Sequence, residues 1–556
     1  QKVDKSKENF GIRPLPNLET NFVAANTLVG LEKPKQLFIR HPEIDKKEEE
    51  LKNLRHRYFN IRAREEKLKL QEKNRKIREE IAQLLIKNGW GEQSARKIAD
   101  FDLFDQNASS DWFDPEWRFG VTDGFDIVIG NPPYVKQEKI KDKELICKFL
   151  KSFDKSLKID KRSDLYVYFY YRGLQFLKSD GILCFISSNS WLDTRFGKSL
   201  REYLLKHAHP ISIVYNAVEK TFEAEINTVI VLIRKSQSIS QKDMVKFIVE
   251  NDLKQNKVVT KTRNELFEEW NYTGGRWGLY LRAPDVFFKV LEKGKGKIVK
   301  LGSIACVVSG VITGDNQKYY TPFRHGYDQE RYLLAFKSPK DLKTIVCTKY
   351  DAKWLLKSEV NFLSKTADFL LGDTKHDRFV VHWNKDKLVF EHKLIGINPN
   401  SKDYLKPLLL MLNSTLFSLI TELFGKFNLG EGALYINPSD VEEMLVVHPK
   451  FLEVLSKENF EDFLKRPIKS IFEELGFEKC KKRNCKHPEH PLEYVNLDEL
   501  TLDRIAKDRR KLDKIVFEVL DLTEKEQLEV YKGLLKLVKE RVIKARKNKA
   551  NCYGQC

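Results

Sequence analysis

Long apolar runs and paired cysteines are scarce in this chain of 556 residues. No stretch approaches the roughly 18 apolar residues of a membrane span, and the opening QKVDKSKENF lacks the apolar core of a signal peptide. The eight cysteines are scattered rather than arranged in a framework, which excludes a disulfide-stapled secreted domain. We therefore expect a cytoplasmic protein without a membrane partner.

Basic residues outnumber acidic ones, with 99 Lys and Arg against 80 Asp and Glu, so the formal net charge is +19. This surplus favours a polyanionic partner such as nucleic acid. Nucleotide enzymes that never contact DNA also carry such a surplus, so charge alone does not decide between them. The length excludes a single core and predicts roughly two to four domains.

A charged segment from about Glu43 to Lys87 carries apolar residues at spacings of three and four, which predicts one long helix or a helical hairpin. This seam consists of Leu51, Leu54, Tyr58, Ile61, Ile77, Ile81 and Leu84. We interpret residues of about 43–97 as a solvated helical insertion in a domain. An arm that contacts DNA phosphates is the alternative.

The stretch Phe125–Val135, FDIVIGNPPYV, combines a short apolar strand with a stiff loop. The strand residues, broken only by Asp126, predict a parallel strand buried on both faces. Two prolines remove two backbone donors and disfavour helical geometry before them, so Asn131 to Tyr134 should form an extended loop at the strand's carboxyl end. From here to about residue 295, strand-like and helix-like runs alternate, which predicts an α/β fold with a doubly wound, Rossmann-like sheet. In such sheets, ligands bind at the carboxyl ends of the strands.

The loop offers two acceptors, the side-chain carbonyl of Asn131 and the peptide carbonyl of Pro132, which a rigid backbone holds close together. A planar exocyclic amine that donates to both loses conjugation with its ring as its nitrogen becomes tetrahedral, and its lone pair is exposed for attack. Tyr134 offers a face for stacking, worth about 1–3 kcal/mol per base. A base in a duplex has to be flipped out to reach such a loop. The plainer alternative is an asparagine that caps a turn.

With this loop the sequence resembles the adenine-N6 DNA methyltransferases, and more closely the modification and specificity portion of the type IIG restriction-modification enzymes. The resemblance covers nearly the whole chain, and the motifs that stand in the family's order are PLPNLETNFVAANTLVGL, FDQNASSDWFDPEWRFGVTDGFDIVIGNPPYV, SDLYVYFYYRGLQFLKSDGILCFISSNSWL, LGSIACVVSGVITGDN and DRRKLDKIVFEVLDLTEKEQLEVYKGLLKLVKERVIKA. It implies transfer of the methyl group of S-adenosylmethionine to adenine N6 in double-stranded DNA. It also implies a role in prokaryotic restriction-modification or phage defence.

Site residues follow from the same resemblance. Roles in catalysis and in stacking on the target base are implied for Asn131, Pro132, Pro133, Tyr134 and Phe222. Contacts with the cofactor are implied for Asn26 and Asp164. Asn26 stands where many relatives carry an acidic residue, whereas Asp164 has the alternative of a helix N-cap and Phe222 that of an ordinary core residue.

We expect three regions along the chain. Residues 1–295 would form the methyltransferase domain, residues 296–450 a mixed α/β target-recognition domain, and residues 451–556 a helical C-terminal region. Small residues that allow close approach and polar residues that suit phosphates or base edges stand together in SGVITGDNQKYY and FGKFNLGEGALYI. The candidate DNA-binding residues are Thr313, Asn316, Lys318, Lys426 and Asn428. Ordinary surface turns are the alternative for both stretches.

One element that the resemblance implies is missing. The family holds its cofactor with a glycine-rich turn after the first strand, because only glycine lets the backbone come so close. The glycines before residue 120 are Gly11, Gly30, Gly89 and Gly91. The last two follow a charged helix, and FNLGEG at Phe427–Gly432 is a poor permuted substitute. We expect that Gln1 lies inside a longer protein, with the first strands, the turn and any fused nuclease upstream; a separate nuclease is also compatible.

A metal site is not predicted. Residues of the types that bind zinc stand at Cys480, Cys485, His487 and His490, but their spacing is not that of a standard finger.

Two other functions stay open. One is methyl transfer to an RNA base or to the amide of a protein glutamine side chain, because the same loop can hold either planar amine. The other is a specificity module that binds DNA but, without the glycine-rich turn, transfers nothing.

Overall fold

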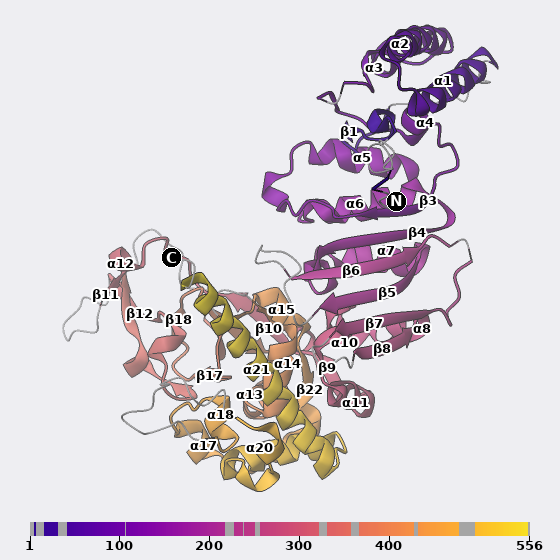
Figure 1. Cartoon of the computed structure of the whole chain (residues 1–556). Helices are drawn as coiled ribbons and strands as arrows, with labels where there is room; N and C mark the ends of the chain where they lie inside the picture. Colours follow the sequence, from indigo (N-terminus) through magenta and orange to yellow (C-terminus); the bar gives the residue numbers. More distant parts are fainter. Residues whose placement is uncertain are drawn as a thin grey trace. The chain divides into compact units, whose positions relative to one another are not determined.

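The computed structural model describes residues 5–6, 16–31, 42–105, 107–216, 227–236, 238–250, 256–321, 331–356, 366–427, 432–477 and 495–553. The chain divides into two compact units, residues 1–267 and 268–556 (Figure 1). Several sheets and many helices confirm the mixed α/β class. The doubly wound arrangement and the three functional regions stay predictions.

The first unit is built on a six-stranded mixed sheet with the order β3-β4-β6-β5-β7-β8 (Figure 1). Its strands are β3 Phe125–Gly130, β4 Leu177–Ser188, β5 His209–Asn216, β6 Thr228–Arg234, β7 Met244–Glu250 and β8 Lys257–Thr262. β3 pairs with β4 in parallel, as β5 does with β7, and the other neighbouring pairs are antiparallel. The parallel β3–β4 pair therefore brings the carboxyl ends of both strands to one edge of the sheet.

One face of this sheet is packed. Alternate residues of a strand share a face, and the residues of this face that are 0% exposed include Leu183, Ile213, Val231 and Phe247. Helix α6, Leu165–Phe176, packs on it over β4. A Cβ atom at Gly173 of α6 would lie 2.4 Å from Leu183 Cδ1, so this helix can approach β4 only with glycine there. The other helices of the unit are α1 Pro42–Asn60, α2 Arg64–Lys87, α3 Glu92–Asp100, α4 Pro115–Phe119, α5 Lys143–Phe153, α7 Lys198–His207 and α8 Arg263–Glu268.

The opposite face of the sheet is open. Ile127 and Ile129 of β3 are 63% and 76% exposed, and Ile230 and Val258 on β6 and β8 are also exposed. The prediction that β3 is buried on both faces is therefore wrong. Among the described residues β3 is an edge strand that pairs only with β4, and no described helix buries its two isoleucines.

The charged segment after residue 42 forms a helical hairpin, which confirms that prediction. Helix α1 packs against α2, and the chain breaks between them at residues 61–63. Most of the seam is buried, with Leu54 and Tyr58 of α1 in the same cluster as Ile77 and Ile81 of α2, whereas Ile61 and Leu84 are partly buried. Before the hairpin, strand β1, Ala24–Ala25, pairs in parallel with β2, Ser109–Ser110.

The second unit contains a five-stranded sheet, β10-β19-β15-β17-β13, a four-stranded sheet, β11-β14-β12-β18, and two smaller ones, β16-β21-β20 and β22-β9 (Figure 1). The strands are β9 Ile298–Lys300, β10 Ala305–Ser309, β11 Tyr320–Thr321, β12 Tyr332–Phe336, β13 Val346–Cys347, β14 Lys353–Leu356, β15 Phe369–Gly372, β16 Thr374–Lys375, β17 Val381–Asn384, β18 Val389–Phe390, β19 Leu394–Pro399, β20 Lys426–Phe427, β21 Leu434–Tyr435 and β22 Leu445–Val447.

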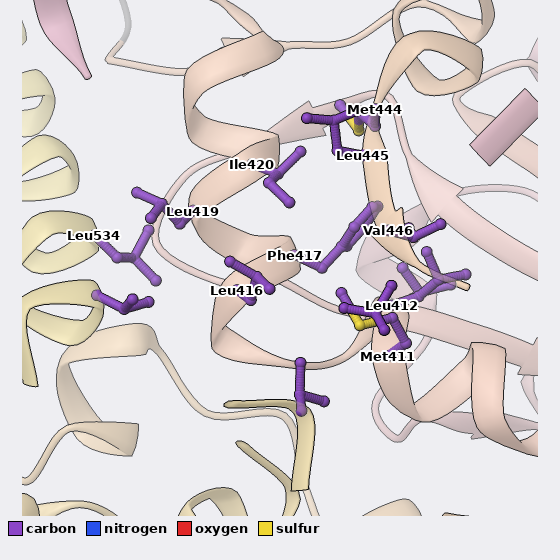
Figure 2. Close-up of a cluster of buried hydrophobic side chains, with 14 of the residues drawn as sticks. Met411, Leu412, Leu416, Phe417, Leu419, Ile420, Met444, Leu445, Val446 and Leu534 are labelled. Carbon is purple, nitrogen blue, oxygen red and sulfur yellow. The ribbon is translucent and has the colours of Figure 1, made fainter. Parts of the chain in front are cut away.

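One large hydrophobic core joins the five-stranded sheet and the helices of the second unit, and two smaller clusters hold buried residues of the four-stranded sheet. Around α14, Leu419 lies on the side toward Leu534 of α21 and Phe417 on the side toward Val446 (Figure 2). The helices are α9 Trp270–Thr273, α10 Gly278–Arg282, α11 Asp285–Lys293, α12 Asn316–Tyr319, α13 Leu405–Leu412, α14 Thr415–Phe424, α15 Pro438–Glu443, α16 Glu453–Lys457, α17 Glu461–Lys465, α18 Ile471–Glu474, α20 Lys507–Val519 and α21 Glu524–Tyr553.

Within the described ranges, no single helix is long and apolar enough to cross a membrane. The segments Lys402–Leu412 and Thr415–Phe424 reach the required length and hydropathy only together, and they meet at 76°. Every residue of α14 is buried in the core of the second unit.

The buried His382 of β17 makes the stability of the second unit dependent on pH. Its Nδ1–H donates to the carbonyl oxygen of Thr344 at 2.8 Å, and burial lowers the pKa of His382 to about 4. Between pH 6.5 and 4 the unfolded imidazole binds a proton that the folded one does not, so the free energy of unfolding should fall by up to roughly 3 kcal/mol as the pH decreases over this range. Chemical unfolding of the chain and of His382→Asn across this range measures the effect. The variant should flatten the pH dependence, and equal slopes in both proteins would contradict the assignment.

Candidate active site

The chain leaves the sheet at the end of β3 and continues as a loop of irregular extended backbone. Asn131 and Pro133 are exposed, Pro132 is buried and Tyr134 is half-buried. The backbone N–H of Leu165, the first residue of α6, donates to the carbonyl oxygen of Val135 at 3.0 Å. In the part of the chain that the structure describes, the Asn131 side chain makes no hydrogen bond, so it does not cap a turn there. The predicted loop at the strand's carboxyl end is confirmed.

Asp164 fixes the far end of this loop. One of its carboxylate oxygens accepts the backbone N–H of Gln137 at 3.1 Å, and the other accepts from Lys136 Nζ at 3.3 Å. The residue stands at the N-cap position of α6, but its side chain makes no capping hydrogen bond. Asp164 therefore connects the loop to the start of α6 and does not cap the helix.

Tyr134 is oriented by its neighbours on β4 and α6. Its hydroxyl donates to the carbonyl oxygen of Ile186 at 3.4 Å, and its ring meets that of Tyr166 edge-on, with centroids 6.4 Å apart. Burial raises the pKa of Tyr134, so its hydroxyl is neutral at physiological pH. With its hydroxyl tied down, the half-buried ring is held next to the exposed Asn131.

The carboxyl end of β4 adds polar groups that sequence reasoning did not single out. Ser187 is buried and its hydroxyl lies 2.8 Å from that of Tyr170. The backbone N–H of Asn189 donates to the carbonyl oxygen of Asn227, directly before β6. A signal was present in the sequence, because the apolar run GILCFI of β4 changes at once to SSNS. Phe222, the second stacking candidate, lies outside the described residues.

The stretch around Asn26 is anchored to the same helix, α6. Arg172 Nε donates to the carbonyl oxygen of Thr27 at 2.8 Å, and its Nη2 donates to that of Phe113 at 3.1 Å. Burial lowers the pKa of Arg172 to about 10. Asn26 itself is exposed, and its side-chain oxygen accepts the N–H of Leu28 at 3.2 Å. Sequence reasoning missed Arg172. This residue connects the stretch around Asn26 to α6, and Asp164 connects the same helix to the loop after β3.

The candidate DNA-binding residues of the second unit lie in separate elements, with Thr313 just before α12, Asn316 and Lys318 within α12, and Lys426 in β20. Thr313 and Asn316 bond to each other at 2.5 Å, and Asn316 Nδ2 also donates to Glu391 at 3.3 Å. Lys318 is exposed. Lys426 begins β20 and forms an ion pair with the buried Asp440 at 3.0 Å. Asn428 and most of Phe427–Gly432 lie outside the described residues.

No group of three or more His, Cys, Asp and Glu side chains close enough to hold a metal occurs among the described residues. The cluster of zinc-like residue types, at Cys480, Cys485, His487 and His490, lies outside them.

The family model of the Eco57I restriction-modification methylase matches residues 29–222. The type II methyltransferase M.AccI of Acinetobacter calcoaceticus is 26% identical over 254 residues, which are 42% of this chain and 44% of that protein. M.BstVI of Geobacillus stearothermophilus is 38% identical over 112 residues, 20% of this chain and 19% of the relative. The matched parts thus span less than half of the length of these relatives.

Two solved structures are similar at low identity. The type IIG restriction endonuclease BpuSI is 11% identical with a TM-score of 0.32, and the match covers 76% of this chain and 54% of that one. The type IIL restriction-modification enzyme MmeI in complex with DNA is 12% identical with a TM-score of 0.38, and the match covers 74% and 57%.

Proposed function

We propose that this chain, which carries an Eco57I restriction-modification methylase domain over residues 29–222, methylates the N6 amine of adenine in double-stranded DNA with S-adenosylmethionine. The observation that carries the proposal is the loop after β3. Asn131 is exposed there, its side chain makes no hydrogen bond to the described residues, and the loop is fixed to α6 through Val135 and Asp164. This supports the proposal that Asn131 and Pro132 provide a preorganised pair of acceptors and Tyr134 a stacking ring.

The residues present fit part of the cofactor. The exposed amide of Asn26, on a stretch held by Arg172, suits the polar edge of an adenine ring. When bound, S-adenosylmethionine supplies a methyl group on a positively charged sulfur, ready for displacement. The described residues provide no glycine-rich turn next to a parallel strand, so the pocket for the methionine part is not assigned to them.

In the proposed reaction, the loop holds and activates the amine. The two N6 hydrogens donate to Asn131 Oδ1 and to the carbonyl oxygen of Pro132, which favours the tetrahedral form of the nitrogen and exposes its lone pair. Tyr134 stacks on the flipped base and fixes its plane. No general base is needed before transfer, because the neutral amine attacks and afterwards releases one proton to water. Holding amine and methyl group in line supplies most of the rate.

The test is transfer of labelled methyl from S-adenosylmethionine by the longest natural polypeptide that contains this chain. Mixed-sequence duplex DNA, RNA and protein serve as acceptors, and the labelled products are identified by nucleoside and amino-acid analysis. We expect label in N6-methyladenine of duplex DNA. Label confined to RNA or to glutamine would replace the proposed substrate, and DNA binding without any transfer would make the chain a specificity module.

A further inference from the structure

The segment between the candidate catalytic loop and α6 is strongly basic. Residues 136–162 contain ten Lys and Arg but five Asp and Glu, a surplus of five positive charges against +19 for all 556 residues. A charge run of this kind is usually a solvated face. Whether it is more than that depends on which cations are already neutralised and on where they lie.

Few of these cations are neutralised. Arg162 pairs with Asp160 at 3.3 Å, and Lys136 pairs with Asp164. The acids are also engaged, since Asp154 accepts the hydroxyl of Tyr203 at 3.0 Å. The exposed lysines that form no ion pair with any described residue are Lys139, Lys141, Lys148, Lys151, Lys155, Lys158 and Lys161.

The two ends of the segment are tied together next to the loop. Lys143 Nζ donates to the carbonyl oxygens of Gln137 at 3.0 Å and Lys161 at 2.9 Å. The chain from Asn131 to Lys136 spans at most about 18 Å. Over that length a duplex presents about ten phosphate charges, at one per roughly 1.7 Å of axis. The end of the segment at Lys161 therefore lies within reach of the phosphate backbone around a base held by Asn131.

Helix α7 and the residues just before it add cations to the same surface. Burial acts to raise the pKa of Asp160, but hydrogen bonds from Arg162 and the charges of Arg162 and Arg195 bring it below its ordinary value. A hydrogen bond from Lys206 lowers the pKa of Glu202, and the charges of Lys158 and Lys198 act in the same direction. Tyr203 of α7 contacts Asp154 of the segment, so Lys198 at the start of this helix and Arg195 just before it stand on the side of the segment. We define the basic surface as Lys155, Lys158, Lys161, Arg162, Arg195 and Lys198.

The helical hairpin α1–α2 provides a contrast, because four of its lysines form ion pairs, namely Lys47, Lys52, Lys73 and Lys76. Lys47 contacts Glu80 at 2.7 Å, and Lys73 contacts Glu50 at 2.8 Å. Exposed pairs such as these are worth little to stability, yet they leave less charge for a phosphate. The hairpin is therefore the weaker candidate for a DNA-contacting arm.

We propose that the basic surface binds the phosphate backbone of the duplex beside the nucleotide held at Asn131, independently of base sequence. The inference rests on the proposed function and names a second DNA contact for it, within the catalytic unit. Phosphate contacts fix register and orientation rather than sequence. They also keep the opened strand in place while one base is extruded, which costs a few kcal/mol of unstacking.

The experiment compares two triple variants in the full chain. One is Lys155→Gln, Lys158→Gln and Lys161→Gln on the basic surface. The other is Lys52→Gln, Lys73→Gln and Lys76→Gln, which removes the same charge from the hairpin. Affinity for a random-sequence duplex is measured by fluorescence anisotropy at several KCl concentrations, and melting temperatures verify folding.

We expect the basic-surface triple to make the plot of log Kobs against log salt shallower by about 2–3, at about 0.9 per lost contact, and the hairpin triple to leave it unchanged. An unchanged slope in the first variant, or an equal change in both, would overturn the proposal, as would binding of the chain to anionic lipid vesicles but not to duplex. Methyl transfer is assayed in parallel. If the basic-surface triple changes the salt dependence but the unchanged chain transfers no methyl group, the DNA-binding surface is supported and the proposed reaction fails. If methyl transfer occurs but the triple leaves the salt dependence unchanged, the reaction is supported and the surface is refuted.

Discussion

Replacing Asn131 with alanine is expected to lower the rate of methyl transfer to duplex DNA by about 100-fold or more. Loss of one preorganised polar group at a reacting centre typically costs about 10²–10³ in kcat, and here it removes one of only two proposed acceptors for the amine. Stability should hardly change, because Asn131 is exposed and its side chain makes no hydrogen bond to the described residues. Initial rates with labelled S-adenosylmethionine, at saturating DNA, measure the effect on kcat.

The matched control is Asn53→Ala, which removes another exposed asparagine, on α1, whose amide donates to Glu49 at 3.4 Å. This variant should keep the full rate. Asn131→Gln keeps the amide but moves it by one methylene, so it should also lose most of the rate. A variant at Asn131 that keeps a third of the activity with normal DNA binding would refute the role of the side chain.

The loop around Asn131 was predictable from the sequence because its determinants are local. An apolar run followed by two prolines fixes a strand, its end and a stiff extended continuation within a dozen residues. The helical hairpin was predictable for the same reason, since apolar spacings of three and four residues recur in both α1 and α2. Local pattern was enough for both.

The exposure of Ile127 and Ile129 was not predictable in this way. An apolar run says that a strand prefers burial, but which strands and helices cover it depends on pairing over long sequence distances. β3 pairs with β4, more than 45 residues later, and no described strand takes its other edge. The error therefore concerns tertiary neighbours rather than secondary structure.

The residues that position the site were beyond sequence reasoning for a similar reason. Arg172 bonds to Thr27, 145 positions away, and Asp164 bonds to Gln137, 27 positions away. In the second unit, Asn316 meets Glu391, 75 positions along the chain. A polar residue's type indicates that it needs a partner, whereas the fold decides which one it finds.

The second large effect concerns stability, and it is expected at the buried ion pair of Glu422 on α14 and Arg541 on α21. Arg541 Nε and Nη2 donate to the two carboxylate oxygens at 2.6 and 3.0 Å, and both side chains are about 95% buried. Arg541 also donates to the carbonyl oxygens of Gly432 and His376. Four of the five N–H groups of this guanidinium are thus engaged with α14 or the neighbouring loops, which fixes α21 against the core.

Glu422→Ala should lower the free energy of unfolding of the second unit by about 3–5 kcal/mol, because it leaves a buried guanidinium without its counter-ion. Hydrogen exchange of amides in α14 and α21 is the suitable measurement, since it reports this unit separately from the first. Glu540→Ala, which breaks an exposed pair with Lys536 at 3.8 Å on the same helix, is the matched control and should cost about 0.5 kcal/mol at most. The double variant Glu422→Leu/Arg541→Met removes both charges and should recover most of the loss. If Glu422→Ala cost no more than the control, the pair would contribute nothing beyond its packing, and the attachment of α21 would have to come from apolar contacts such as Leu534 alone.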